Sequence, residues 1–251
     1  MGRFCCAVVS QLEALYLGFN ELTSLPENFG NLRRLKKLDL SVNKLKKLPA
    51  SFKNLTALKS LSLERNILEV LPNEIGEFKE LKELVLYGNR LSKLPEALFS
   101  LKKLNTLNLG NNILTELSSE IGALENLVEL ALWENQITIL PKSIGNLKKL
   151  KKLSLLENLL SDLPDELFQL QELEELSVGN NQLKELPEQV SQLMNLKELE
   201  IYENEFTALP DSIIKLKNLE SIFIPDHVFT LTSAQDEWMK EINEKRHIFA
   251  W

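Results

Sequence analysis

The chain has 251 residues, of which 44% are hydrophobic and 26% are charged, and its formal net charge is −7. This composition is typical of a chain that folds around an apolar core, and it excludes an intrinsically disordered one. The acidic balance disfavours nucleic acid as a partner, because binding to phosphates depends on lysine and arginine, and no apolar run is long enough to predict a membrane span.

Residues 1–11 contain both cysteines, Cys5 and Cys6, side by side. Adjacent cysteines rarely bridge each other, so no disulfide framework is expected. In the register of the repeat that follows, Cys6 aligns with Phe29 and Val9 with Leu32, which predicts a partial first coil without a cap. Either a natural capping segment has been removed or two copies cover each other there, as a homodimer. The segment is too short and too weakly patterned for a signal peptide, so the localisation stays undetermined.

Residues 12–230 form about ten repeats of 23 residues. Relative to the asparagine of each repeat, leucine lies five residues before it, and Leu, Val or Ile lies three residues before it. Proline lies six residues after the asparagine in every repeat but one, which has Ser118, and His227 replaces the asparagine in a degenerate tenth unit. The asparagines are Asn20, Asn43, Asn66, Asn89, Asn112, Asn135, Asn158, Asn181 and Asn204.

Each repeat predicts a short strand, a turn at the asparagine, an extended segment before proline and one helical turn. Alternating apolar residues indicate a half-buried strand, and a strand so short must stack beside the next one in a parallel sheet. The asparagine amide has both donors and acceptors, so stacked asparagines are expected to form a ladder of hydrogen bonds. Apolar residues three apart, such as Phe29 and Leu32 or Ile75 and Phe78, fit one helical turn.

Residues 231–251 leave the repeat and predict a C-terminal capping helix. Ser233 with Asp236 suggests a capping box, and Trp238 with Ile242 gives an apolar stripe at helical spacing. Phe249 and Trp251 are expected to help cover the last coil. Packing in the cap is the expected role of His227 and His247, because no cysteine or carboxylate lies at metal-ligand spacing from them.

The pattern LxxLxLxxNxLxxLPxxIxxL resembles the leucine-rich repeat family in its 23-residue form, and it is similar to short bacterial proteins of spirochaetes and to plant and animal signalling relatives. The resemblance implies an α/β right-handed solenoid, or horseshoe, forming a single domain over residues 1–251. It also implies a parallel concave β-sheet, short helical turns on the convex side and a function in binding proteins. If the bacterial resemblance holds, the partner is a host or cell-surface protein and the chain is secreted or displayed at the surface.

The concave face carries the candidate binding site. Because side chains alternate along a strand, positions two and four before each asparagine are expected to point away from the core. Tyr87 and Trp133 are predicted to flank a notch at Gly110, a seat for a partner's side chain, since Trp and Tyr are enriched in binding hot spots. The alternative is that Trp133 only lies flat on Leu156. The expected partner-binding residues are Tyr87, Trp133, Leu156, Val85, Ala131, Tyr202, Glu64 and Glu200.

Three further interpretations stay open. Concave glutamates, such as Glu134 with Glu157 or Glu175 with Glu198, could bind a glycan or a cation; alternatively, the chain is the recognition segment of a larger intracellular signalling protein. Charge is also uneven: residues 33–59 are mainly basic and residues 165–205 mainly acidic, which can orient a charged partner, promote self-association or only maintain solubility. No catalytic residue, metal site or cofactor is predicted, because carboxylates on an open surface stay solvated.

Overall fold

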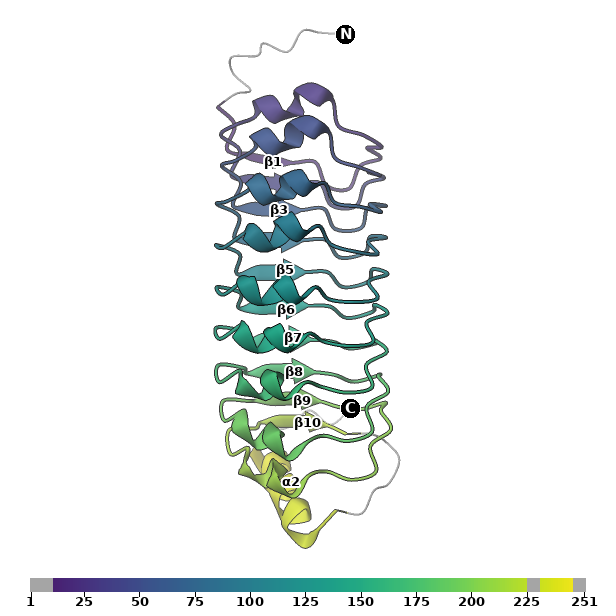
Figure 1. Cartoon of the computed structure of the whole chain (residues 1–251), viewed down its shortest axis with the longest axis vertical. Helices are drawn as coiled ribbons and strands as arrows, with labels where there is room; N and C mark the ends of the chain where they lie inside the picture. Colours follow the sequence, from purple (N-terminus) through teal and green to yellow (C-terminus); the bar gives the residue numbers. More distant parts are fainter. Residues whose placement is uncertain (1–10, 225–230, 246–251) are drawn as a thin grey trace.

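The computed structural model describes residues 11–224 and 231–245 (Figure 1). The predictions for Cys5, Cys6, Val9, His227, His247, Phe249 and Trp251 lie outside these residues. Figure 1 shows the coils stacked one after another in a long column, with α2 (Ser233–Lys245) at the C-terminal end. In the part that is described, no helix combines the length and the apolar character needed to cross a membrane.

Ten strands of three residues form one parallel sheet whose strand order equals the chain order. Each strand pairs with the same positions of the next repeat, as in the pair Ala14 and Lys37. The predicted solenoid is therefore confirmed, because every repeat adds one strand to the sheet. The strands are β1 (Ala14–Tyr16), β2 (Lys37–Asp39), β3 (Ser60–Ser62), β4 (Glu83–Val85), β5 (Thr106–Asn108), β6 (Glu129–Ala131), β7 (Lys152–Ser154), β8 (Glu175–Ser177), β9 (Glu198–Glu200) and β10 (Ser221–Phe223).

A short 3₁₀ helix follows each extended segment, as the spacing of apolar residues predicts. Proline precedes eight of these helices in the extended conformation, for example Pro26 with φ −70° and ψ 150°. Ser118 takes the place of proline before η5, where its side chain accepts a hydrogen bond from the Glu120 N–H. The helices are η1 (Glu27–Asn31), η2 (Ala50–Asn54), η3 (Asn73–Glu77), η4 (Glu96–Ser100), η5 (Ser119–Ala123), η6 (Lys142–Asn146), η7 (Asp165–Gln169), η8 (Glu188–Gln192) and η9 (Asp211–Lys215).

The asparagines form the expected ladder. The Asn135 amide donates to the carbonyls of Leu132 and Trp133 in its own coil, at 2.9 and 3.2 Å, and to Leu109 of the preceding coil at 3.1 Å. Its side-chain oxygen accepts a hydrogen bond from the Leu114 N–H at 3.0 Å. The pattern repeats from Asn43 to Asn204, whose side chains are buried, whereas Asn20 in the first described coil is exposed. Each buried asparagine therefore satisfies backbone groups in two coils.

The residue before each asparagine adopts a left-handed conformation, which the sequence pattern did not predict. Its φ lies between 48° at Asn111 and 68° at Gly88, and only Gly88 among the nine residues is a glycine. This conformation is unfavourable for Val42 and Phe19, which have φ values of 51° and 56°. Hydrogen bonds to the next coil offset the cost, as from the Val42 N–H to the Glu64 carbonyl at 2.8 Å.

The core is a continuous apolar column between the sheet and the 3₁₀ helices. The leucine in the middle of a strand and the leucine just after the strand, such as Leu130 and Leu132, are almost completely buried. Phe52 packs between the rings of Phe29 and Phe78, with ring centroids 6.1 and 5.6 Å apart. Burial of this apolar area is the main source of stability. It requires neighbouring coils, because a single coil cannot cover its own apolar side chains and buries them only by stacking against the coils on either side.

At the C-terminal end, α2 covers the last coil with Trp238 and Ile242, both buried. The predicted capping box is wrong by one residue. Thr232 accepts a hydrogen bond from the Gln235 N–H at 3.3 Å and donates its own N–H to the Gln235 side chain at 3.0 Å. Gln235 is preferred because its amide also donates to the carbonyls of Leu209 and Pro210, whereas Asp236 forms an ion pair with Lys240.

Candidate functional site

Three columns of side chains form the side of the sheet that is turned away from the core, which was predicted to be concave and is called the concave face below. In β6, Leu130 is buried, whereas Glu129 and Ala131 on either side of it point outward. The outward columns are therefore the positions six, four and two before each asparagine. Sequence reasoning predicted the second and third columns, which lie four and two residues before each asparagine. It missed the first column, which contains Glu129 and Lys152, except for the pair of Glu175 and Glu198.

A shallow depression of about 200 Å³ lies on this face across β5 to β8. Small side chains form its floor because the second column has Asn108, Ala131, Ser154 and Ser177 on four consecutive strands. Lys152 and Glu175 border it as an ion pair, with 2.7 Å between nitrogen and oxygen. The depression is lined by Thr106, Leu107, Asn108, Glu129, Leu130, Ala131, Lys152, Leu153, Ser154, Glu175 and Ser177.

Trp133 lies beside this depression and leans toward the preceding coils. Its ring centroid is 4.9 Å from that of Tyr87, two coils earlier. A Cβ atom added to Gly110 would lie 2.5 Å from the indole Cε2 and 2.6 Å from Nε1, so the indole rests directly on this glycine. The predicted open notch at Gly110 is wrong, because the indole itself fills it. The alternative that placed the ring on Leu156 is also wrong, since the ring points the other way.

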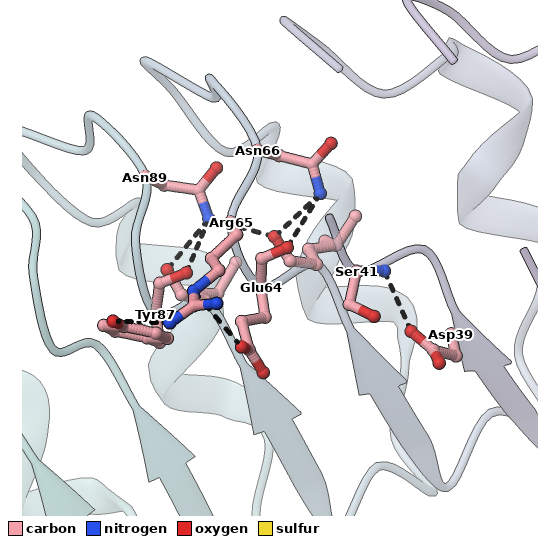
Figure 2. A network of polar contacts seen from close by, with 9 residues as sticks. Asp39, Ser41, Glu64, Arg65, Asn66, Tyr87 and Asn89 are labelled. Atoms are coloured by element: carbon pink, nitrogen blue, oxygen red, sulfur yellow. Dashed lines mark hydrogen bonds and ion pairs between the residues drawn. The ribbon is translucent and has the colours of Figure 1, made fainter. Parts of the chain in front are cut away.

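Arg65 extends this aromatic pair (Figure 2). Its guanidinium carbon lies 5.4 Å from the centre of the Tyr87 ring, and Nη2 donates to the Tyr87 hydroxyl at 3.4 Å. This hydrogen bond raises the pKa of Arg65. Glu64 lies on the other side of the guanidinium, with 3.8 Å between Glu64 Oε1 and Arg65 Nε. Arg65, Tyr87 and Trp133 therefore form a stack of a cation and two rings across three coils and the intervening Gly110.

The predicted site residues fall into two groups. Tyr87, Trp133, Ala131, Leu156 and Val85 come from neighbouring coils; Val85 pairs with Asn108, and Asn108 with Ala131, in the sheet. Glu64 belongs with them through Arg65. Tyr202 and Glu200 lie further along the sheet, at β9 and the turn after it. All eight side chains are half-buried, as expected for residues that cover a sheet without entering the core.

The acidic positions do not form a metal centre. Across residues 11–224 and 231–245, no three His, Cys, Asp or Glu side chains lie together in a way that could hold a metal ion. Glu175 pairs with Lys152, and Glu134 accepts a hydrogen bond from the Asn111 amide. These contacts disfavour the cation-binding alternative for the predicted glutamate pairs.

Sequence reasoning also missed a larger groove, of about 920 Å³, at the edge of the coils away from the sheet. It runs across the segments before the prolines of four consecutive repeats, from Thr138 to Pro210. Ile139 on its wall is 68% exposed. Its walls mix both charges, and Lys142 and Glu166 form an ion pair at 3.4 Å.

Comparison with known proteins agrees with the repeat. A family model described as a leucine-rich repeat region matches residues 7–90 and 73–178. No curated protein sequence matches the chain. A leucine-rich repeat protein of Leptospira interrogans is 33% identical with a TM-score of 0.81, and the match covers 94% of this chain and 71% of that one.

Two plant receptors are similar to the chain as well. The repeat ectodomain of the Arabidopsis thaliana membrane receptor kinase GASSHO1/SCHENGEN3, in complex with CASPARIAN STRIP INTEGRITY FACTOR 2, is 32% identical with a TM-score of 0.82. The peptide hormone receptor RGFR1, in complex with RGF2, is 33% identical with a TM-score of 0.73. These matches cover 91% and 86% of this chain but only 29% and 40% of the receptor chains.

The matched region, the ladder and the ten-stranded parallel sheet all point to one architecture, which generally serves as a binding scaffold without enzymatic activity. The chain belongs to the leucine-rich repeat family.

Proposed function

We propose that the chain is a non-enzymatic module that binds a partner protein through its concave face, centred on Trp133, Tyr87 and Leu156. The observation that carries the proposal is the depression across β5 to β8, which has a floor of small residues and an aromatic pair beside it. A floor of small side chains admits a partner's backbone or side chain, and a ring held in place by Tyr87 and Gly110 loses little entropy on binding. The receptors RGFR1 and GASSHO1/SCHENGEN3, which form complexes, support the same use of the fold.

Capture of a partner by immobilised protein tests the proposal. Trp133→Ala should reduce capture at least tenfold, because buried aromatic residues dominate interface energies. Ile139→Ala is the matched control, since Ile139 is an exposed apolar residue away from the sheet. If Trp133→Ala captures the partner as well as the wild type does and Ile139→Ala does not, the concave face is not the binding surface, and the groove lined by Ile139 is.

The finer predictions extend this proposal. A secreted or surface bacterial protein that acts on host proteins, and a recognition segment of a larger signalling chain, both stay predictions; the similarity to the Leptospira protein supports the first and the short coverage of the receptors supports the second. A homodimer through the N-terminal end is supported by Leu12, Leu15 and Leu17, which are only partly buried. Light scattering during size-exclusion chromatography tests it, and a monomeric mass at high protein concentration would exclude it.

A further inference from the structure

The two halves of the concave face differ in charge. In β6 to β9 and the turns after them, the outward columns and the left-handed position carry seven glutamates and one lysine, Lys152. The same positions in β1 to β4 carry three acidic residues and two basic ones, and there Glu64 and Arg65 neutralise each other. The seven glutamates are Glu129, Glu134, Glu157, Glu175, Glu198, Glu200 and Glu203.

Tyr202 lies within this acidic half and rests on a glycine, as Trp133 does. A Cβ atom added to Gly179 would lie 2.8, 2.9 and 3.0 Å from Cε1, Cζ and Cδ1 of the ring. Nearly equal distances to three ring atoms mean that one face of the ring lies over Gly179, and the side chain is half-buried, so part of the ring stays accessible to solvent. Burial and the charges of Glu200, Glu157 and Glu203 raise the pKa of Tyr202, so all three carboxylates act on this ring.

Tyr87 shows what such a ring binds within the same molecule. Tyr87 and Tyr202 occupy the same position of their repeats, two residues before asparagine. The Tyr87 ring is covered by Arg65, whose charge is balanced by Glu64 of the preceding coil. At Tyr202 the two equivalent residues of the preceding coil are Asn180 and Gly179. Across the described residues, no ion pair involves Glu157, Glu200 or Glu203. Tyr202 therefore has carboxylates around it but no arginine in the place that Arg65 takes beside Tyr87.

We propose that the face of Tyr202, with Glu157, Glu200 and Glu203 around it, binds an arginine side chain of the partner protein, so that the partner presents a basic segment to β6–β9. A guanidinium fits because it is planar, stacks on aromatic rings and is more weakly hydrated than an ammonium group. This inference rests on the proposed function, since it names the chemistry of the partner at the same face. The acidic half also speeds the approach of a basic segment and orients it relative to the nearly neutral half.

Three synthetic nonapeptides test the assignment. They share glycine and serine spacers and differ only at three positions, which hold arginine, lysine or citrulline; citrulline keeps the shape of arginine without its charge. The isotope-labelled chain is titrated while the ring resonances of its three tyrosines, Tyr16, Tyr87 and Tyr202, are followed by NMR. The arginine peptide should shift the Tyr202 resonances and bind at least fivefold more tightly than the citrulline peptide, with the lysine peptide between them.

Variants separate the ring from the fold. Tyr202→Ala and Glu200→Gln should each weaken the arginine peptide at least threefold, whereas Tyr202→Phe, which keeps the ring face, should bind nearly as wild type. Tyr16→Ala is the control, because Tyr16 is an exposed tyrosine at the opposite end of the sheet. Equal binding of the arginine and citrulline peptides, unchanged binding by Tyr202→Ala, or shifts of the Tyr202 ring saturated by calcium chloride alone would each overturn the inference.

The proposed function and this inference fail separately. Loss of partner capture in Trp133→Ala together with no arginine response at Tyr202 would keep the concave binding face and reject a basic partner. If the arginine peptide shifts the Tyr202 resonances but Trp133→Ala captures the partner as well as the wild type does, Trp133 is not the centre of the interface, and the arginine-binding site at Tyr202 is retained.

Discussion

Trp133 and Trp238 occupy two regions of the molecule that place opposite demands on a large aromatic side chain. Trp238 at the C-terminal end is 4% exposed and closes the core, whereas Trp133 on the concave face is half-buried and packs against Tyr87 and Gly110. Trp238 must exclude water from the apolar side chains of the last coil, which would otherwise be exposed at the end of the core. The position of Trp133 leaves part of the ring accessible to solvent, so its contribution to stability is expected to be smaller. The difference separates residues that build the solenoid from residues that the solenoid displays.

The largest expected effect sharpens this comparison directly. Trp238→Ala should lower the free energy of unfolding by about 3–5 kcal/mol, because it removes buried area and leaves a cavity at the end of the core. Trp133→Ala should cost about 1 kcal/mol, since its ring is only half-buried. Urea denaturation followed by circular dichroism measures both values. Similar losses in the two variants would show that Trp133 belongs to the folding core.

The asparagine ladder offers a second pair of matched changes. Asn135→Ala should lower the free energy of unfolding by about 2–4 kcal/mol, because three carbonyls and one N–H lose their buried partner. Asn20→Ala should cost less than about 1 kcal/mol, since Asn20 is exposed and water can replace its bonds to Leu17 and Gly18. Thermal melts of both variants test this order, and a loss in Asn135→Ala no larger than that in Asn20→Ala would contradict a stabilising role for the buried hydrogen bonds of the ladder.

A third change moves the displayed ring without removing it. Gly110→Ala should displace the Trp133 indole, because the new methyl group would lie within 2.6 Å of Cε2 and Nε1. We expect a new position for the indole N–H resonance of Trp133, with a stability loss of about 1–2 kcal/mol. Gly18→Ala is the control, because the side chains nearest to Gly18 belong to Ser41 and Asp39. An unchanged indole resonance in Gly110→Ala would contradict the packing described for Trp133.

The smallest effect concerns a charge network on the outer edge of the coils. Lys151 and Lys197 donate to Glu174 at 2.7 and 2.6 Å, and these hydrogen bonds lower the pKa of Glu174 to about 2. Because the folded-state pKa is below the ordinary value of 4.5, the stabilisation is fully present above pH 4.5 and is lost as the pH falls through about 2. The melting temperature of Glu174→Gln should therefore lie slightly below that of the wild type at pH 7 and converge with it near pH 2. Added salt should also reduce the difference, since Glu174 is only half-buried and both lysines are exposed to solvent.

Much of the fold follows from the 23-residue period. The leucine five residues before each asparagine predicts the buried centre of every strand, as at Leu130, and the proline predicts the extended entry to every 3₁₀ helix. The partners of the asparagines could be foreseen as well, because stacking identical coils brings identical backbone groups together. The left-handed residue before each asparagine was not foreseen, since Val42 and Phe19 are poor residues for that conformation and only the ladder of hydrogen bonds enforces it.

The sequence by itself determined the repeat, the strand face on which Trp133 lies and the columns that surround it, because the alternation of side chains along a strand fixes direction before any packing is known. Only the tertiary structure decided that the indole leans onto Gly110 and meets Tyr87, that Tyr202 rests on Gly179 while lacking the arginine that covers Tyr87, and that Thr232 rather than Ser233 begins the cap. The physical reason is that a side chain's rotamer depends on the space and charges offered by the neighbouring coil, 23 residues away in the sequence but adjacent in the sheet.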